Sequence, residues 1–172
     1  MISKEYKEQL LELRRGRRWG ASAHKHASKV LSFAEEVGAK SVLDYGAGEQ
    51  TLKDVVDLEY YAYDPAVPEI DKRPLPECDI VVALDVLEHV EPIYTQAVLE
   101  DIWKQARFGV LLYIPIKEAC AILPDGRNAH INIQSPQEWL VQIGALPTNR
   151  IKAEYDDRAI IIHAYTTFTK RD

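Results

Sequence analysis

Two short and almost uniformly apolar runs constrain the fold more than any other feature of the chain. They cover residues 79–84 (DIVVAL) and 109–114 (GVLLYI), and a helical pattern at 93–107 lies between them. Runs of this length and composition are typical of strands that are buried on both faces of a parallel sheet. Because strand and helix patterns alternate along most of the chain, the sequence predicts an α/β fold with a mostly parallel, helix-covered sheet.

The remaining elements extend this pattern toward both ends. The spacing of Tyr6, Leu10 and Leu13 predicts a first helix, and a second is expected from a cap at Ser22 to Gly38. Further strands are expected at 41–45, 60–63, 149–155 and 159–167, and further helices at 52–58 and 136–143. The last two strands form a hairpin, which gives the sheet an antiparallel C-terminal edge. The short stretch before residue 79 implies that the fold is compressed between its second and third expected strands.

Charge is unevenly distributed along the chain. Residues 1–40 hold nine Lys and Arg against five Glu, whereas the other 132 residues hold 12 basic against 22 acidic side chains. An acidic body repels a phosphate backbone, so duplex nucleic acid is not an expected partner. The basic segment 14–18 leaves contact with a nucleic-acid end open, against the simpler interpretation of a solvated helix end. No membrane span is expected, and Cys78 and Cys120 lack metal or disulfide spacing, which predicts a cytoplasmic protein with reduced thiols.

Two glycines follow the first expected strand, and an acidic residue ends the second. Gly46 and Gly48 form a turn that lets a ligand approach the backbone closely. Asp64 comes 16 residues after Gly48, where a ribose diol would lie. A dinucleotide fingerprint would need a further glycine where Thr51 stands, so an NAD-dependent oxidoreductase is the weaker alternative.

Four strings give the most specific signal in the chain. They are DYGxGxxTL at 44–52, YDPA at 63–66, DVLEHVEP at 85–92 and DGRNAH at 125–130. With these motifs the chain resembles the class I S-adenosylmethionine (SAM)-dependent methyltransferases, and more closely small phage and bacterial methyltransferase-domain proteins. The resemblance implies a Rossmann-like class I methyltransferase sheet. It also implies one structural domain, in which residues 1–38 form an N-terminal helical lid and residues 39–172 bind SAM.

The cofactor contacts implied by the resemblance come from the glycine turn and the ends of three strands: Asp44, Gly46, Ala47, Gly48, Gln50, Asp64, Pro65, Asp85, Val86 and Leu87. The glycine turn would wrap the methionine part of SAM, with Asp44 near its ammonium group. Asp64 would accept both ribose hydroxyls. Gln50 stands where the family usually has the third glycine of the loop, which puts the affinity for SAM in question.

Four residues of the types that coordinate metal ions follow two of the expected strands. Asp85, Glu88 and His89 have the spacing of one helical turn, and His130 follows the neighbouring strand, whose end opens on the same crevice. They form a candidate site for Mg²⁺ or Mn²⁺, similar to that of small-RNA 3′-terminal 2′-O-methyltransferases and, in part, of ubiquinone-pathway O-methyltransferases. In the alternatives, His89 or His130 is a metal-free catalytic base, or Glu88 and His89 only fasten the turn.

The expected function is SAM-dependent O-methylation of a hydroxyl on a small molecule, a sugar or a nucleotide-like group. The candidate metal would assist this reaction if the site binds one. Candidate acceptor contacts are Trp19, Asp125, Arg127 and Asn128. The simpler interpretation makes Trp19 a core anchor and the other three a turn. A non-catalytic SAM-binding module and an RNA-end 2′-O-methyltransferase are the alternative functions.

Overall fold

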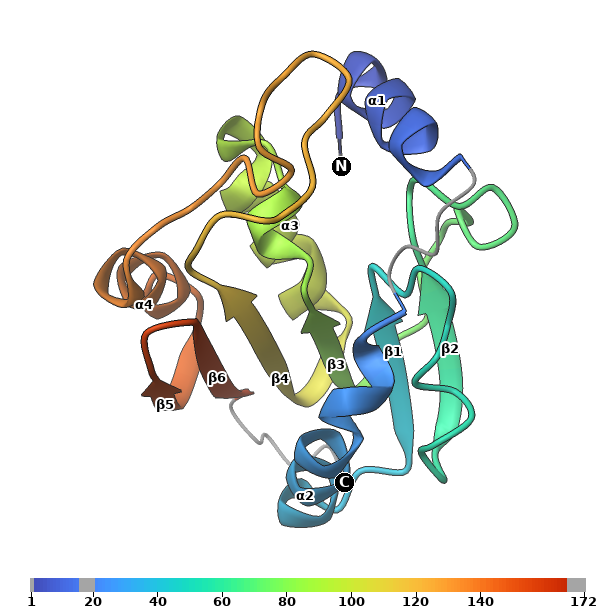
Figure 1. Ribbon diagram of the computed structural model, residues 1–172. Helices are drawn as coiled ribbons and strands as arrows, with labels where there is room; N and C mark the ends of the chain where they lie inside the picture. The colour runs from blue at the N-terminus through green and yellow to red at the C-terminus, as the bar shows by residue number, and fades with distance from the viewer. Residues whose placement is uncertain (1, 16–20, 167–172) are drawn as a thin grey trace.

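The computed structural model describes residues 2–15 and 21–166, which contain a six-stranded sheet (Figure 1). The strands are β1 (Ser41–Tyr45), β2 (Glu59–Tyr63), β3 (Cys78–Leu84), β4 (Ala106–Pro115), β5 (Thr148–Tyr155) and β6 (Ala159–Thr166). Their order in the sheet is β2-β1-β3-β4-β6-β5. Strands β1 to β4 are parallel, and the β5–β6 hairpin adds the antiparallel edge. The predicted fold class is confirmed.

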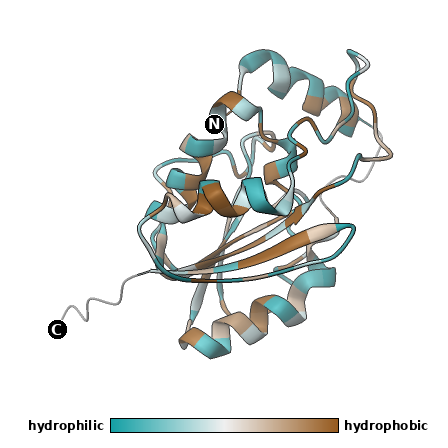
Figure 2. Cartoon of the chain, turned by 90° about the vertical axis from the view of Figure 1, so that its left-hand side faces the viewer, coloured by the Kyte–Doolittle hydropathy of each residue, from teal (hydrophilic) through white to brown (hydrophobic). Residues whose placement is uncertain are grey.

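Helices pack on both faces of the sheet. They are α1 (Lys4–Arg14), α2 (Ala27–Val37), α3 (Thr95–Lys104) and α4 (Pro136–Gly144). On one face, Ile102 of α3 and Trp139 of α4 are fully buried in one cluster with β1, β3, β4 and β6. On the other face, Val30 and Phe33 of α2 are buried with Val42 of β1. Figure 2 shows the hydrophobic strands between these helices, as expected for strands buried on both faces.

Local sequence signals set the helix ends. The Ser3 hydroxyl accepts a hydrogen bond from Tyr6 N (3.1 Å) at the start of α1. Ser135 and Glu138 form a reciprocal capping box at the start of α4. Gly38 ends α2 in the left-handed conformation, with φ of 70°.

Two predicted local features are wrong, and the helix expected over 93–107 ends at Lys104 because Ala106 and Arg107 already belong to β4. Residues 52–58 contain turns and no helix, since Val55 N bonds to Leu52 O, three residues back. The β-branched pair Val55-Val56 and the shortness of the segment both disfavour a helix. Ser22 does not cap the second helix, because its hydroxyl donates to Asp85 and a 3₁₀ helix (Ala23–His26) precedes α2.

The compressed segment between β2 and β3 contains no strand, as its length predicted. At the carboxyl ends of the parallel strands lie α1 and the long loop 116–135 (Figure 1). They pack together: Tyr6, Leu10 and Leu13 of α1 form a third buried cluster with Leu123 and Ala129 of the loop. Among the helices described, none has the length and apolar character needed to span a membrane.

Candidate functional site

A cavity lies at the carboxyl ends of β1, β2 and β3. From the sheet side it is lined by Gly46, Asp64, Pro65, Asp85, Val86 and His89. From the N-terminal segment it is lined by Leu10, Arg14, Ser22 and Ala23. In an open α/β sheet this edge is where ligands bind. Five of the predicted cofactor residues (Gly46, Asp64, Pro65, Asp85 and Val86) therefore line a common cavity.

The glycine turn is held against the end of β2. Gly46 N and Ala47 N both donate to Tyr63 O, at 2.6 and 3.1 Å. Gly46 has φ of 82°, and a Cβ on it would lie only 2.5 Å from Val86 Cγ2. Glycine is therefore required at this position by both conformation and packing.

Gln50 adopts the left-handed conformation that a glycine would adopt without strain, with φ of 56°. We expect Gln50→Gly to raise the free energy of unfolding by no more than about 1 kcal/mol, because relief of this strain is partly offset by greater freedom of the unfolded chain. The affinity for S-adenosylhomocysteine (SAH) should be unchanged or a few-fold tighter. Chemical denaturation and calorimetry measure both quantities. Loss of SAH binding would instead make the Gln50 side chain a ligand contact.

Asp64 is the buried carboxylate that faces the cavity, with 5% of its surface exposed. Its Oδ2 accepts from Gly48 N (3.1 Å) and from Arg14 Nη2 (3.1 Å), and its Oδ1 accepts from Ala66 N (2.8 Å). The backbone bonds fix the carboxylate beside the glycine turn. Asp64 is therefore positioned to accept hydrogen bonds from a diol bound in the cavity.

Five predicted cofactor residues lie outside the cavity lining: Asp44, Ala47, Gly48, Gln50 and Leu87. Ala47, Gly48 and Gln50 belong to the glycine turn, whereas Asp44 and Leu87 are buried away from it. The Asp44 carboxylate is buried on the α2 side of the sheet, where Oδ2 accepts from the Tyr60 hydroxyl at 2.8 Å. Burial raises the pKa of Asp44 to about 7, although the Tyr60 hydrogen bond opposes the shift. Leu87 is fully buried in the core beside α3.

Glu88, His89 and His130 converge in one group, and His89 also lines the cavity. The Glu88 Oε1 atom lies 3.8 Å from His89 Nε2 and 4.0 Å from His130 Nε2. One ligand atom from each residue lies within 4.8 Å of the others. Glu88 is fully buried, and neither of its carboxylate oxygens has a hydrogen-bond partner in the described part of the chain. Burial raises the pKa of Glu88 well above its ordinary value.

Backbone carbonyls orient both imidazoles. His89 Nδ1 lies 2.7 Å from Ala129 O, and His130 Nδ1 lies 2.5 Å from Lys117 O. A carbonyl can only accept, so both Nδ1 atoms carry the proton. In the neutral rings Nε2 then carries the lone pair, and both Nε2 atoms face the Glu88 carboxylate. Burial lowers the pKa of His89 to about 4, so its ring is neutral at ordinary pH. Two imidazole nitrogens and one carboxylate form a donor set suited to a divalent cation.

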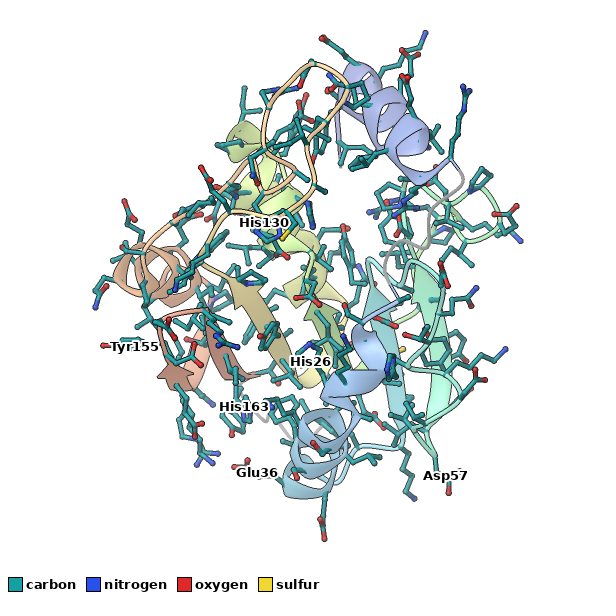
Figure 3. All side chains as sticks on the ribbon, in the orientation of Figure 1. His26, Glu36, Asp57, His130, Tyr155 and His163 are labelled. Carbon is teal, nitrogen blue, oxygen red and sulfur yellow. The ribbon has the colours of Figure 1, made fainter. Side chains whose placement is uncertain are left out.

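Asp85 does not join this group, which differs from the predicted set of four ligands. Its backbone is left-handed, with φ of 58°. Its Oδ2 accepts from the Ser22 hydroxyl at 2.5 Å and lies 3.7 Å from His26 Nε2. The 3₁₀ helix (Leu87–His89) begins only after Asp85, so the helical spacing assumed for the four residues does not apply. Figure 3 shows His26 in front of the sheet and His130 at its upper edge.

Of the predicted acceptor residues, Asn128 fastens the loop that carries His130. Its side chain bonds to both backbone groups of Ala119 and accepts from His130 N (2.9 Å). The Arg127 guanidinium pairs with Asp125 at 2.6 Å, and Asp125 also accepts from Gln9 on α1. Trp19 lies outside the described residues.

The structure adds residues that sequence reasoning missed. Arg14, Ser22 and His26 reach the site from the N-terminal segment, where Arg14 had been interpreted only as part of a basic cluster. Asn132 holds the turn of Glu88, since its N donates to Glu88 O (3.0 Å) and its side chain donates to Leu87 O (3.1 Å). No local pattern marks these contacts, because each joins residues more than 40 positions apart in the chain.

Comparison with known proteins identifies the fold. No model of a known protein family matches the sequence, and no curated protein does. Among solved structures, the DhpI–SAH complex is similar with a TM-score of 0.65 and 17% identity, over 95% of this chain and 98% of that one. A 1,6-didemethyltoxoflavin N1-methyltransferase from Burkholderia thailandensis, bound to 1,6-didemethyltoxoflavin and SAH, is also similar. Its TM-score is 0.59 at 17% identity, over 86% of this chain and 80% of that one.

A third neighbour is the magnesium protoporphyrin IX methyltransferase of Synechocystis PCC 6803 with bound SAH. Its TM-score is 0.59 at 14% identity, over 85% of this chain and 84% of that one. The chain therefore has the fold of the class I SAM-dependent methyltransferases.

Proposed function

We propose that the chain is a SAM-dependent methyltransferase that methylates a hydroxyl of a small molecule, with a divalent metal bound by Glu88, His89 and His130. The observation that carries the cofactor assignment is the buried Asp64 carboxylate beside the glycine turn, at the edge of the sheet where this fold binds nucleosides. Two of the neighbours named above, the 1,6-didemethyltoxoflavin and the magnesium protoporphyrin IX methyltransferases, are named for small-molecule substrates, which supports an acceptor of this class.

Turnover tests this proposal directly. The chain is incubated with methyl-labelled SAM and Mn²⁺, and with pools of hydroxyl-bearing metabolites, sugars and short oligonucleotides with a free 3′ end. Mass spectrometry then detects SAH and a product heavier by one methyl group. SAH formation that depends on an acceptor is expected. SAM binding without turnover on any pool would favour the alternative of a non-catalytic SAM-binding module.

The metal assignment is supported by the orphaned Glu88 carboxylate and by the two oriented imidazoles. A buried carboxylate without a hydrogen bond is costly, and a bound cation would remove that cost. With Asp85 turned away, the donor set is two nitrogens and one oxygen, which favours Mn²⁺ over the harder Mg²⁺. When bound, the metal would lower the pKa of the acceptor hydroxyl and orient it.

Without a metal, His130 is the better candidate for the base that removes the hydroxyl proton. The lowered pKa of His89 makes its ring a weak base. His130 also borders a surface groove, together with Pro92, Ile93 and Arg127. Ile93 is 83% exposed there. This groove is the proposed approach of the acceptor to the site.

Glu88→Gln tests separately how the buried carboxylate affects stability and whether it binds a metal. The amide is neutral and can donate to a histidine Nε2, so we expect the metal-free variant to be at least as stable as the wild type. Because the pKa of Glu88 is raised on folding, the folded wild type binds more protons than the unfolded chain. Wild-type stability therefore falls as pH rises above about 4.5, and the advantage of the variant grows over the same range. Denaturation at several pH values measures the difference.

Glu88→Gln should also lose its affinity for Mn²⁺. In the wild type, Mn²⁺ must displace the Glu88 proton, so its apparent affinity should increase with pH. Calorimetry in buffers of different ionisation enthalpy should detect about one released proton per bound metal. Glu138→Gln, which changes an exposed carboxylate at the cap of α4, is the matched control and should bind Mn²⁺ normally. Equal Mn²⁺ affinity in wild type and Glu88→Gln would contradict the metal assignment.

A further inference from the structure

Arg14 of α1 occupies part of the hydrogen-bonding capacity of Asp64. Its Nη2 donates to Asp64 Oδ2 at 3.1 Å, and its Nη1 donates to Ala66 O at 3.1 Å. The two side chains of this pair are only 18% and 7% exposed. Arg14 also lines the cavity itself. A cation from the N-terminal helix therefore sits at the position assigned to the cofactor ribose.

Counting acceptor positions on Asp64 shows a conflict. A carboxylate offers about four lone-pair positions. Among the described residues three donors already use them: Gly48 N, Ala66 N and Arg14 Nη2. A ribose diol needs two positions, so one donor has to leave. The two amides belong to the fixed turns that hold Asp64, whereas Arg14 is a long side chain on a separate helix.

We propose that Arg14 is a latch that competes with the cofactor ribose for Asp64, so that binding of SAM releases the C-terminal end of α1. This inference rests on the proposed function and adds regulation of the same site. The latch has consequences beyond Asp64 because α1 also touches the acceptor side. Leu10 and Leu13 pack on Leu123 and Ala129 of the loop that carries His130.

Other contacts keep α1 attached when the latch opens. Lys7 Nζ pairs with Asp71 at 2.6 Å, and the Ser3 hydroxyl donates to Glu91 at 2.8 Å. These contacts lie at the N-cap and in the N-terminal half of α1, whereas Arg14 is the last residue of the helix. Release of Arg14 would therefore free the C-terminal half of α1 to move against the loop that carries His130, while the N-terminal half stays attached.

The test compares Arg14→Met with Lys7→Met by calorimetric titration of SAH. Both variants remove one cation–carboxylate pair from the same helix and keep a good helix former, but only Arg14 touches Asp64. We expect SAH to bind Arg14→Met about 5-fold more tightly or better than the wild type, and Lys7→Met to stay within about 2-fold of it. The gain should appear with adenosine and be absent with 2′,3′-dideoxyadenosine, which lacks the diol.

Hydrogen exchange of residues 4–14 provides the second measurement. We expect faster exchange in Arg14→Met than in the wild type, and faster exchange in the wild type when SAH is added. Unchanged or weaker SAH binding by Arg14→Met would overturn the latch, as would an equal gain in Lys7→Met or with the dideoxy compound. Exchange that SAH slows or leaves unchanged would overturn it too. If SAH binds neither the wild type nor the variants, the proposed function fails as well; if SAH binds the wild type, only the latch is at stake.

Discussion

Asp64→Ala is expected to weaken the binding of SAM and SAH by about 30-fold to 1000-fold. The reason is the loss of two charge-assisted hydrogen bonds to the ribose, each worth about 1.5–3 kcal/mol before water compensates in part. The variant also removes the carboxylate that Arg14 binds, so Arg14 no longer competes with the ribose. This gain offsets only a small part of the loss. Calorimetry with SAH measures the change.

The control for this prediction lies on β2, the strand that Asp64 directly follows. Glu59→Ala removes an exposed carboxylate at the other end of β2, and it should leave the affinity for SAH unchanged. Because Asp64 also orders Gly48 and Ala66, Asp64→Asn serves as a second variant that keeps an acceptor oxygen for the backbone. Equal SAH affinity in the wild type and both Asp64 variants would show that the ribose does not bind at Asp64.

His130→Ala is expected to lower the affinity for Mn²⁺ by about 100-fold or more and to reduce methyl transfer strongly. It removes one of three ligands, a larger change than the 10-fold to 100-fold loss typical when an outer-shell partner is removed. Affinity for SAH should change by less than about 2-fold, because the His130 ring faces Glu88 on the acceptor side. Manganese titration followed by electron paramagnetic resonance, together with the turnover assay, measures both effects.

His163→Ala is the matched control for the loss of an imidazole. His163 lies on β6 beside Phe33, well separated from His130 in Figure 3. It should keep full Mn²⁺ affinity. If His130→Ala retains Mn²⁺ affinity and loses only turnover, His130 is the metal-free base. If it retains both, His130 has no part in the reaction.

The central strands β3 and β4 could be predicted from the sequence because they are buried on both faces. Ile80 to Val82 and Val110 to Leu112 are almost completely buried, so selection for burial leaves a nearly continuous apolar run. The segment 52–58 was mispredicted for a related reason. Leu52 and Val56 are buried with helical spacing, yet the segment forms turns over 51–55 and no helix.

The candidate site could be predicted where its residues are neighbours in the chain. Gly46 to Gly48 and the Glu88-His89 pair each depend on one turn, and a turn leaves a local signature. Asp85 was assigned to the wrong cluster because the helical spacing of its motif ignores a left-handed residue at the strand end. Arg14 and Ser22 could not be found in this way, since their partners are 50 and 63 residues away.

Calorimetric titration of the 172-residue chain with SAM, and in parallel with NAD, tests the central claim most directly. The cavity beside Asp64 predicts one SAM per chain, with SAH competing for the same site and no measurable binding of NAD. Binding of NAD in place of SAM, or of neither compound, would contradict the account.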